Sequence, residues 1–442
     1  MKFKKICVLG LGYIGLPTAA TFARHGMEVL GVDINAGVID TLRGGGVHIH
    51  EPGLGEIVQQ AIASGRLTVA AEPAPADAFI IAVPTPFHED MYGRHNDETY
   101  RLADMRAVTA AARSILPHLR PGNLVVLEST SPPRTTVDLI VPLLEASGLH
   151  AGRDFHVCYS PERVLPGQIL RELIENARVI GGVTPESASL GAELYATFVK
   201  GEIVQTDATT AEMVKLMENT YRDVNIAIAN EFSRLAERFG VDVWETIALA
   251  NRHPRVKILS PGPGVGGHCI SVDPWFLVEA APELTPLILH ARQVNATQPL
   301  FVIEKIRQAI GDLAGKQVAA LGLAYKADVD DLRESPAVEV VHLLTNLGAR
   351  VRAYEPFKPE ADLKGIETVP SLQDALANAD ALLLLVNHTQ FRDFDPTEIA
   401  GMTPARLVID AVHGWEEKPW SDAGFRFFRL GANKTQLLNQ KS

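Results

Sequence analysis

The N-terminal stretch KKICVLGLGYIGLPTAATFARHGMEVLGVDIN, residues 4–35, decides the fold of the first part of the chain. An apolar, strand-like run leads into Gly10-x-Gly12-x-x-Gly15, a helical segment follows, and a second strand-like run ends at Asp33. In such a βαβ unit one glycine allows the tight turn, one lets a pyrophosphate approach the backbone, and one lets the helix pack on the strand. The acid after the second strand accepts a ribose 2′-hydroxyl and repels a 2′-phosphate. The stretch therefore predicts an NAD site.

Two later stretches predict further buried parallel strands. ADAFIIAVPTPF covers residues 76–87, and NLVVLESTSPPRTT covers residues 123–136. Because ligands of open α/β sheets lie beyond the carboxyl ends of the strands, Thr85 and Thr130 are expected near the cofactor. Either threonine could instead satisfy the backbone of a turn.

The composition excludes several classes of protein. A chain of 442 residues with 46% hydrophobic and 21% charged residues predicts two or three globular domains. A net charge of −12 argues against nucleic acid or an anionic membrane as a partner. The first residues resemble a signal peptide, but the fixed glycine spacing and the return of charge at Arg24 fit that interpretation badly. No apolar run reaches the ~18 residues that would span a bilayer.

The three cysteines are too few and too scattered for a disulfide framework, and no metal site is expected. Cys7 and Cys158 stand in strand-like apolar settings, so both are expected to be inert core thiols. This cysteine usage fits a reducing cytoplasm.

A single long helix is predicted over residues 209–240. Thr209 and Glu212 are expected to form a capping box, and Gly240 is placed to end the helix. A helix of this length spans about 45 Å, enough to bridge two domains or to pair with a partner subunit. Its apolar positions recur at spacings of three, four and seven: Met213, Met217, Tyr221, Val224, Ile228 and Leu235. On a neighbouring face, Lys215, Asn219 and Arg222 form a polar stripe, which is either functional or simply a solvated surface.

The C-terminal part echoes the N-terminal one. KQVAALGLAYK at 316–326 predicts a strand, which a helix over 336–347 and a strand over 350–356 follow, and ADALLLLVNHTQF echoes ADAFIIAVPTPF. This degenerate repeat predicts an α/β fold of two Rossmann-like, doubly wound parallel-sheet domains joined by a central long-helix region. We expect boundaries at 1–206, 207–300 and 301–442. The second half lacks the glycine motif and has Lys326 instead, which suits a nucleotide diphosphate held by charge.

The stretch GPGVGGHCISVDPWF, residues 262–276, places Cys269 beside four glycines. Core cysteines normally have apolar neighbours, whereas glycines let another group approach the backbone closely. This setting favours a reactive thiol at Cys269 over a packing residue.

Eight motifs together carry a family resemblance. In this order, GLGYIGLP, VPTP, ESTSPP, SPERVLPG, AEMVKLMENTYRDVN, NRHPRV, PGPGVGGHC-x-x-x-DPWF and LAYKADVDDLRESPA resemble motifs of the UDP-glucose/GDP-mannose 6-dehydrogenase family over nearly the whole chain. Two of these stretches, SPERVLPG and NRHPRV, resemble the corresponding motifs of the family members that act on UDP-N-acetyl-D-mannosamine. UDP-N-acetylglucosamine and UDP-glucose remain alternative substrates.

The resemblance implies oxidation of a sugar C6 alcohol to a carboxylate with two NAD⁺, through a thiohemiacetal and a thioester at Cys269. It also implies that the glycines of this loop make room for the sugar and the nicotinamide ring: Gly262, Gly264, Gly266 and Gly267. It implies that Lys215 is the general acid/base or oxyanion stabiliser at C6 and that Asn219 is its hydrogen-bonding neighbour. Asp273 and Thr130 would orient water, and Glu162 would assist hydrolysis of the thioester. Other classes stay open: a two-electron dehydrogenase in which Cys269 is structural, and a non-redox protein that binds NAD and a nucleotide sugar.

The resemblance also implies two sets of ligand contacts and an assembly. The cofactor set is Gly10, Gly12, Tyr13, Ile14, Gly15, Asp33, Thr85, Thr130 and Arg333. The sugar-nucleotide set is Arg163, Val164, Lys215, Asn219, Arg222, His253, Arg255, Gly266, Tyr325 and Lys326. In the family His253 and Arg255 complete the neighbouring subunit's site, which implies a homodimer. The chain departs from the family at Val412, with His413 next, where a Lys or Arg usually contacts a ligand.

Overall fold

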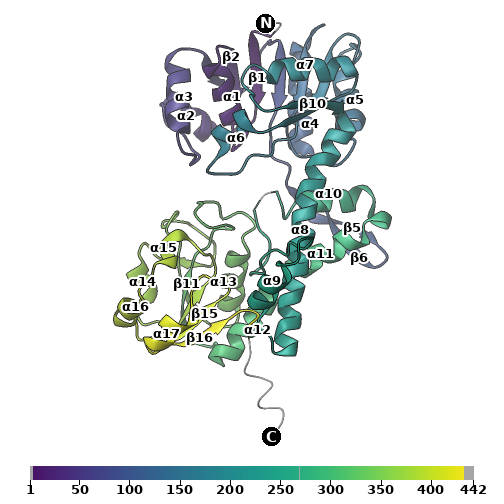
Figure 1. The fold of residues 1–442 in the computed structure, drawn as a ribbon. Coiled ribbons are helices and arrows are strands. Elements are labelled where there is room, and N and C mark those ends of the chain that lie inside the picture. The colour runs from purple at the N-terminus through teal and green to yellow at the C-terminus, as the bar shows by residue number, and fades with distance from the viewer. Residues whose placement is uncertain (1–2, 268, 433–442) are drawn as a thin grey trace. The chain divides into compact units, whose positions relative to one another are not determined.

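The computed structural model describes residues 3–267 and 269–432 (Figure 1). The chain divides into two compact units. The first unit comprises Met1–Glu218 and Trp275–Thr285, and the second comprises Asn219–Pro274 and Pro286–Ser442. Within the described ranges, no helix is both long enough and apolar enough to cross a bilayer.

The first unit is built on a largely parallel sheet. Its strands are β1 (Lys5–Leu9), β2 (Glu28–Val32), β3 (Leu67–Ala70), β4 (Ala78–Ile81), β7 (Leu124–Leu127), β8 (His156–Tyr159), β9 (Arg178–Gly182) and β10 (Ile203–Asp207). They lie in the order β10-β9-β8-β7-β4-β1-β2-β3, and of these pairs only β8 and β9 run antiparallel. The register places Leu9 beside both Val32 and Ile81, so the ends of β1, β2 and β4 meet at one edge of the sheet.

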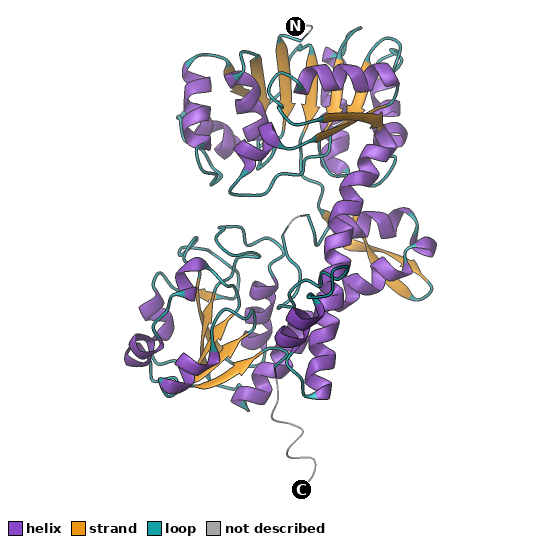
Figure 2. Ribbon diagram, viewed as in Figure 1, coloured by secondary structure: helices purple, strands orange, loops and turns teal. Residues whose placement is uncertain are grey.

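Helices cover both faces of this sheet (Figure 2). They are α1 (Gly15–Arg24), α2 (Ala36–Arg43), α3 (Leu54–Ala63), α4 (Arg106–Ile115), α5 (Val141–Glu145), α6 (Ile169–Glu175) and α7 (Pro185–Tyr195). Strand side chains alternate between the faces. Ile6 and Val8 pack in one core cluster with residues of α1 and α3, while Cys7 and Leu9 pack in another with residues of α4 and α5. The predicted doubly wound arrangement is confirmed here.

An antiparallel hairpin, β5 (Phe87–His95) and β6 (Glu98–Ala103), interrupts the first unit after β4. It packs on α10 (Asp273–Ala280), where the amide of Ala103 donates to Glu279 at 2.8 Å. The sequence analysis did not predict this hairpin, because its polar residues lack a clear alternation of polar and apolar positions.

The second unit repeats the parallel plan. Its strands are β11 (Gln317–Leu321), β12 (Arg350–Tyr354), β13 (Glu367–Thr368), β14 (Ala381–Leu384), β15 (Leu407–Asp410) and β16 (Arg426–Arg429), in the order β13-β12-β11-β14-β15-β16 with parallel pairs throughout. Its helices are α9 (Val243–Ala250), α11 (Pro286–Ala296), α12 (Gln298–Ile310), α13 (Pro336–Asn346), α14 (Leu372–Leu376), α15 (Thr389–Arg392), α16 (Pro396–Met402) and α17 (Glu417–Asp422). The predicted second Rossmann-like half is confirmed.

The long helix is confirmed as α8, which runs from Ala208 to Phe239 and ends at Gly240 with a φ of 68°. The predicted capping box is wrong. The carboxylate of Asp207 accepts from the amide and the hydroxyl of Thr210, while Glu212 is buried and accepts from the backbone of another segment. Donors elsewhere in the first unit therefore outcompete the local cap for the carboxylate of Glu212.

On α8, two polar side chains are buried while several apolar side chains are exposed, which is the opposite of an ordinary surface helix. Lys215 and Asn219 are only 6% and 9% exposed, so the solvated-face interpretation of these two residues is wrong. Apolar side chains instead stand out from the helix, with Met217 at 58% and Tyr221 at 69% exposure. Ile228, Phe232, Leu235 and Phe239 continue this exposed apolar face.

Candidate active site

The glycine turn after β1 has the geometry expected of a dinucleotide-binding loop. Gly10 has a φ of 91°, which favours glycine, and its amide donates to the carbonyl of Val32 at 2.8 Å. A Cβ at Gly15 would stand 1.8 Å from the carbonyl oxygen of Gly10, so α1 packs directly on the turn. A Cβ at Gly12 would meet nothing within 4 Å. The turn and packing roles are confirmed, and the open space at Gly12 suits a phosphate that approaches the backbone.

The carboxylate of Asp33 braces this turn from the end of β2. It accepts from the amides of Leu11 and Asn35, each at 2.9 Å, and it is half-buried. Each carboxylate oxygen keeps a lone pair for a ribose hydroxyl. With the open backbone at Gly12 and the first amides of α1, these residues fit NAD.

The ends of β4 and β7 are tied to each other. The hydroxyl of Ser129 donates to the carbonyl of Val83 at 2.7 Å. Thr85, four residues after the end of β4, is buried, and Thr130, three residues after the end of β7, is half-buried. Both threonines therefore lie at the edge of the sheet where the sequence analysis placed them. Tyr13 and Ile14, at the start of α1, are half-buried.

The first unit also contains a buried network of charged side chains. Arg178 donates to Glu162 at 2.5 Å and to the hydroxyl of Ser160 at 2.9 Å, and it lies 3.5 Å from Glu128. Tyr195 donates to Glu128 at 2.5 Å. Burial raises the pKa of Glu128 to about 7, against the opposing charge of Arg178. The network thus holds one arginine between two carboxyl groups, and burial favours the protonated form of Glu128.

The same network fixes the SPERV segment. The second oxygen of Glu162 accepts from the amides of Arg163 and Val164, at 2.7 and 3.1 Å. The guanidinium of Arg163 pairs with Glu218 on α8 at 2.7 Å. The carboxylate of Glu162 is therefore held in one orientation by three donors, and this also fixes the backbone that carries Arg163 and Val164.

In the second unit, the glycine loop packs on the segment after β11. A Cβ at Gly266 would stand 2.5 Å from the carbonyl oxygen of Glu334, and one at Gly267 would stand 2.7 Å from the ring of Tyr325. Gly264 faces Pro336, and only Gly262 of the four glycines faces open space. Close packing against this segment therefore requires glycine at Gly266 and Gly267, and the expectation that the loop also makes room for ligands stays a prediction.

Cys269 differs from the other two cysteines. It is exposed, whereas Cys7 and Cys158 are buried. Burial raises the pKa of Cys7 to about 11 and also raises that of Cys158. The prediction of two core thiols is confirmed, and the interpretation of Cys269 as a packing residue is wrong.

The residues after Cys269 lead into α10. The carbonyl of Cys269 accepts from the amides of Val272 and Asp273, and the buried carboxylate of Asp273 accepts from Asn219 at 2.5 Å. Burial raises the pKa of Tyr325 to about 12, and the negative charges of Asp331 and the Cys269 thiolate add to the effect. Cys269, Asp273, Asn219 and Tyr325 thus belong to one region of the second unit.

The predicted basic contacts are largely accessible. His253 and Arg255 belong to the fully exposed segment 251–257, and Arg222 and Lys326 are exposed as well. Arg333 pairs with Asp331 at 2.7 Å, with its side chain 47% exposed.

Val412 and His413, where the chain departs from the family, also lie in the second unit. The ring of His413 packs 4.6 Å from that of Trp244, and the amide of Val412 donates to Asp410 at 3.0 Å. Burial and the charge of Arg429 lower the pKa of His413. These two residues therefore pack inside the second unit.

Sequence reasoning missed Glu128, Arg178 and Tyr195. The arginine stands at the start of an apolar strand, RVIGG, which is an unusual place for a charge. That signal could have indicated a buried ion pair, but it does not identify the partners.

A parallel-sheet unit with an NAD-binding turn, joined to a second parallel-sheet unit, is the architecture of an NAD-dependent dehydrogenase. The UDP-glucose/GDP-mannose dehydrogenase family matches in three parts: the NAD binding domain over residues 4–199, the central domain over 209–297 and the UDP binding domain over 319–417. The chain belongs to this family, and its cofactor is NAD.

Individual dehydrogenases are also similar to this chain over nearly its whole length. An NDP-N-acetyl-D-galactosaminuronic acid dehydrogenase of Ralstonia solanacearum is 48% identical, covering 94% of this chain and 97% of the relative. A UDP-N-acetyl-D-mannosamine dehydrogenase of Methanocaldococcus jannaschii is 46% identical over 98% and 97%. The structure of UDP-D-ManNAc dehydrogenase from Pyrococcus horikoshii matches with a TM-score of 0.88 at 41% identity, covering 98% of this chain and all of that one.

Proposed function

We propose that this enzyme oxidises the C6 alcohol of UDP-N-acetyl-D-mannosamine to the carboxylate, with two NAD⁺ per sugar. The exposed thiol of Cys269, in the region of the buried Asn219–Asp273 pair, carries the proposal. Family membership and the names of several relatives support it. A two-electron dehydrogenase would release aldehyde, and a non-redox protein would accumulate no NADH.

The chemistry divides into steps that the residues serve. Loss of a hydride and a proton from C6 leaves an aldehyde, which cannot give a second hydride until a nucleophile adds. The thiolate of Cys269 adds to the aldehyde carbon, so the C–S bond forms while the C=O π bond opens to give the thiohemiacetal oxygen. Loss of the second hydride from C6, with the proton of that oxygen, restores the C=O bond and gives a thioester. Water then breaks the C–S bond, which yields the carboxylate and restores the thiol. NAD⁺, when bound, supplies the hydride acceptor.

We assign the proton and water chemistry to buried polar groups. Lys215, one helical turn before Asn219, holds or removes the proton of the C6 oxygen and stabilises its negative charge. Asp273 and Thr130 orient the water. Glu162 assists thioester hydrolysis, with its orientation supported by Arg178.

The sugar is the finer part of the proposal, and a substrate panel tests it. We expect UDP-N-acetyl-D-mannosamine to give the highest kcat/KM, above UDP-glucose and UDP-N-acetylglucosamine, because sites with buried polar partners reject analogues that leave them unpaired. UDP-N-acetylgalactosamine belongs in the panel, since the Ralstonia relative bears a galactosaminuronic acid name. NADH formation and mass spectrometry of the product provide the readout. A comparable or higher kcat/KM for any other sugar would overturn this choice.

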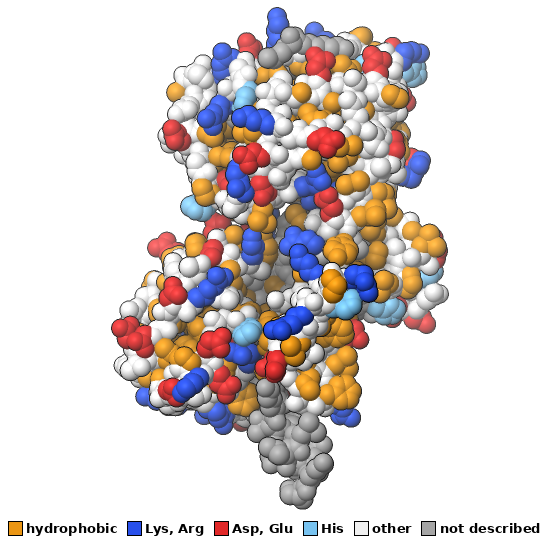
Figure 3. Space-filling view, viewed as in Figure 1, with side chains coloured by type: hydrophobic (Ala, Val, Ile, Leu, Met, Phe, Trp, Pro, Cys, Tyr) orange, Lys and Arg blue, Asp and Glu red, His pale blue; other side chains and the backbone are white. Residues whose placement is uncertain are grey.

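We further infer a homodimer formed through the central region, residues 207–300. The exposed apolar side chains of α8 support this inference, because they recur at helical spacing and are more than isolated surface residues: Met217, Tyr221, Ile228, Phe232, Leu235 and Phe239. Figure 3 shows hydrophobic side chains at several places on the visible surface. A second copy of α8 would cover such a face. The exposed segment 251–257, which carries Arg255, is then free to reach the partner's site.

Subunit complementation tests whether Arg255 acts in the partner's site. Arg255→Ala and Lys215→Ala homodimers should each be nearly inactive. Mixed dimers should regain part of the activity, because one of their two sites keeps both residues. NADH production after mixing is the measurement, with subunit exchange verified by native mass spectrometry. If exchange occurs and no mixture recovers turnover, Arg255 serves its own chain.

A further inference from the structure

The two halves of the chain share a motif that the sequence analysis used only in part. Leu9-Gly10-Leu11-Gly12-Tyr13-Ile14-Gly15 corresponds to Leu321-Gly322-Leu323-Ala324-Tyr325-Lys326-Ala327. The match is also structural, because the amide of Gly10 donates to the last residue of β2 and the amide of Gly322 donates to the last residue of β12, at 2.8 and 2.9 Å. The segment with Tyr325 and Lys326 therefore occupies the place of the dinucleotide turn.

A carboxylate braces the turn in both halves. Asp33 accepts from Leu11, and Glu355, directly after β12, accepts from Leu323 and Ala324 at 2.8 and 2.9 Å. Each carboxylate also accepts from the amide two residues further on. Asp33 is half-buried, whereas Glu355 is 1% exposed. The acid that can receive a ribose in the first half is closed off in the second.

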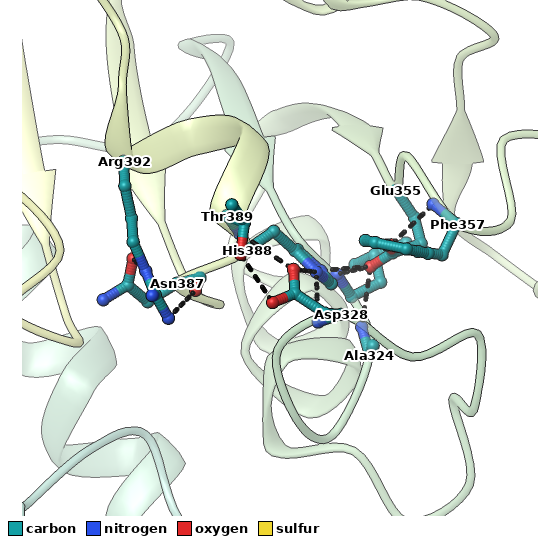
Figure 4. A network of polar contacts seen from close by, with 9 residues as sticks. Ala324, Asp328, Glu355, Phe357, Asn387, His388, Thr389 and Arg392 are labelled. Atoms are coloured by element: carbon teal, nitrogen blue, oxygen red, sulfur yellow. Dashed lines mark hydrogen bonds and ion pairs between the residues drawn. The ribbon is translucent and has the colours of Figure 1, made fainter. Parts of the chain in front are cut away.

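The ring of His388 lies beside the carboxylate of Glu355 (Figure 4). It lies four residues after the end of β14, the position that Thr85 has after β4. Its Nε2 lies 3.1 Å from Glu355, and its Nδ1 lies 2.9 Å from the amide nitrogen of Asp328. Because an amide can only donate, Nδ1 accepts, and the proton of the neutral ring is on Nε2, which donates to Glu355. Burial alone would raise the pKa of Glu355, but the hydrogen bond from His388 and the amide donors outweigh it and lower this pKa.

The segment is thus fixed at both ends. Glu355 holds Leu323 and Ala324 on one side, and His388 holds Asp328 on the other. The amide and hydroxyl of Thr389 add two bonds to the carboxylate of Asp328, at 2.8 and 2.7 Å. Asp328 has a φ of 61°, which is uncommon for a non-glycine residue and is maintained by this surrounding network. Between the two attachments lie Tyr325, Lys326 and Ala327.

We propose that Glu355 and His388 are positioning residues that hold Tyr325 and Lys326 in place for the UDP-sugar, so that the second half has exchanged a ribose site for an anchor. Tyr325 packs on Gly267 of the loop that carries Cys269, so the anchor also supports that loop. The proposal rests on the proposed function for the roles of Tyr325 and Lys326 as substrate contacts.

Calorimetry with UDP and with NAD⁺ on the full-length enzyme tests the proposal. His388→Phe keeps a flat ring but leaves the amide of Asp328 without its acceptor and removes a donor from Glu355. We expect UDP affinity to fall about tenfold. The KM for the UDP-sugar should rise in proportion, while NAD⁺ affinity should stay within about twofold because the first unit binds NAD⁺. His388→Asn, whose amide oxygen can replace Nδ1 as the acceptor, should recover part of the UDP affinity.

A matched control separates positioning from general destabilisation. Trp420 packs against Trp415 and Phe425 in the core of the second unit, and Trp420→Phe should lower the melting temperature without a selective loss of UDP affinity. Unchanged UDP affinity in folded His388→Phe would overturn the proposal. So would equal losses of UDP affinity in His388→Phe and the control, or no recovery with Asn. A wild-type enzyme that binds UDP but oxidises no sugar would overturn the proposed function and leave the anchor standing.

Discussion

Replacing Cys269 with serine should lower sustained NADH production by several orders of magnitude while NAD⁺ and UDP-sugar bind about as well as before. Serine keeps nearly the same shape, but its hydroxyl is a far weaker nucleophile than a thiolate near neutral pH. Cys269 is exposed, so the substitution opens no cavity in a core. The loss should therefore be chemical and not structural.

The stoichiometry of the unchanged enzyme makes this prediction sharper. We expect two NADH per sugar acid and no accumulation of free aldehyde, because the thiohemiacetal retains it. Absorbance of NADH and mass spectrometry of the sugar are the measurements. Cys7→Ser is the matched control: it places a hydroxyl in the core and costs stability, but each folded molecule should keep its turnover. Full turnover in Cys269→Ser, or release of aldehyde after one NADH, would contradict the thioester route.

The local parts of the fold were predictable because local physics determines them. The turn at Gly10, the packing of α1 through Gly15 and the end of α8 at Gly240 each depend on a glycine that a short sequence motif identifies. The second Rossmann-like half could be predicted for the same reason, since its apolar runs repeat the spacing of the first half.

Long-range partners could not be predicted in the same way. The spacing of Thr209 and Glu212 satisfies a capping box, but Glu212 finds better donors at Arg134 and Thr136, more than seventy residues away in sequence. Periodicity likewise identified the two faces of α8 without showing that Lys215 is buried and Tyr221 exposed. A surface helix normally buries its apolar face, and periodicity alone does not show which face packs against the protein.

The glycine loop before Cys269 shows that the need for small residues can be predicted while their protein neighbours cannot. Glycines were expected there because small residues permit close approach, and close approach does occur. The group that approaches Gly266 and Gly267 is the protein's own segment after β11, including Tyr325. The sequence therefore indicates that small residues are needed at these positions but does not identify the group that packs against them.

The glycines of the NAD-binding turn offer a direct test of that distinction. Gly12→Ala places a methyl group in open space, so the melting temperature should stay close to that of the unchanged enzyme, yet NAD⁺ affinity should fall by at least about tenfold, because the methyl occupies the place of the pyrophosphate. Gly15→Ala places a methyl group 1.8 Å from the carbonyl oxygen of Gly10. The turn must move, so both the melting temperature and NAD⁺ affinity should fall, with a stability loss of about 1–3 kcal/mol or more.

Calorimetry with NAD⁺ and thermal unfolding distinguish the two effects. Gly55→Ala in α3 is the control, since its nearest neighbour would be Val47 at 3.7 Å, an ordinary contact. Alanine favours the helix over glycine, so this variant should keep NAD⁺ affinity and gain slightly in stability. If Gly12→Ala binds NAD⁺ normally, the open backbone at Gly12 is not where the pyrophosphate lies. Gly12 and Gly15 stand three residues apart in one motif. If both alanine variants lose NAD⁺ affinity but only Gly15→Ala loses stability, Gly12 makes room for the ligand and Gly15 makes room for the helix.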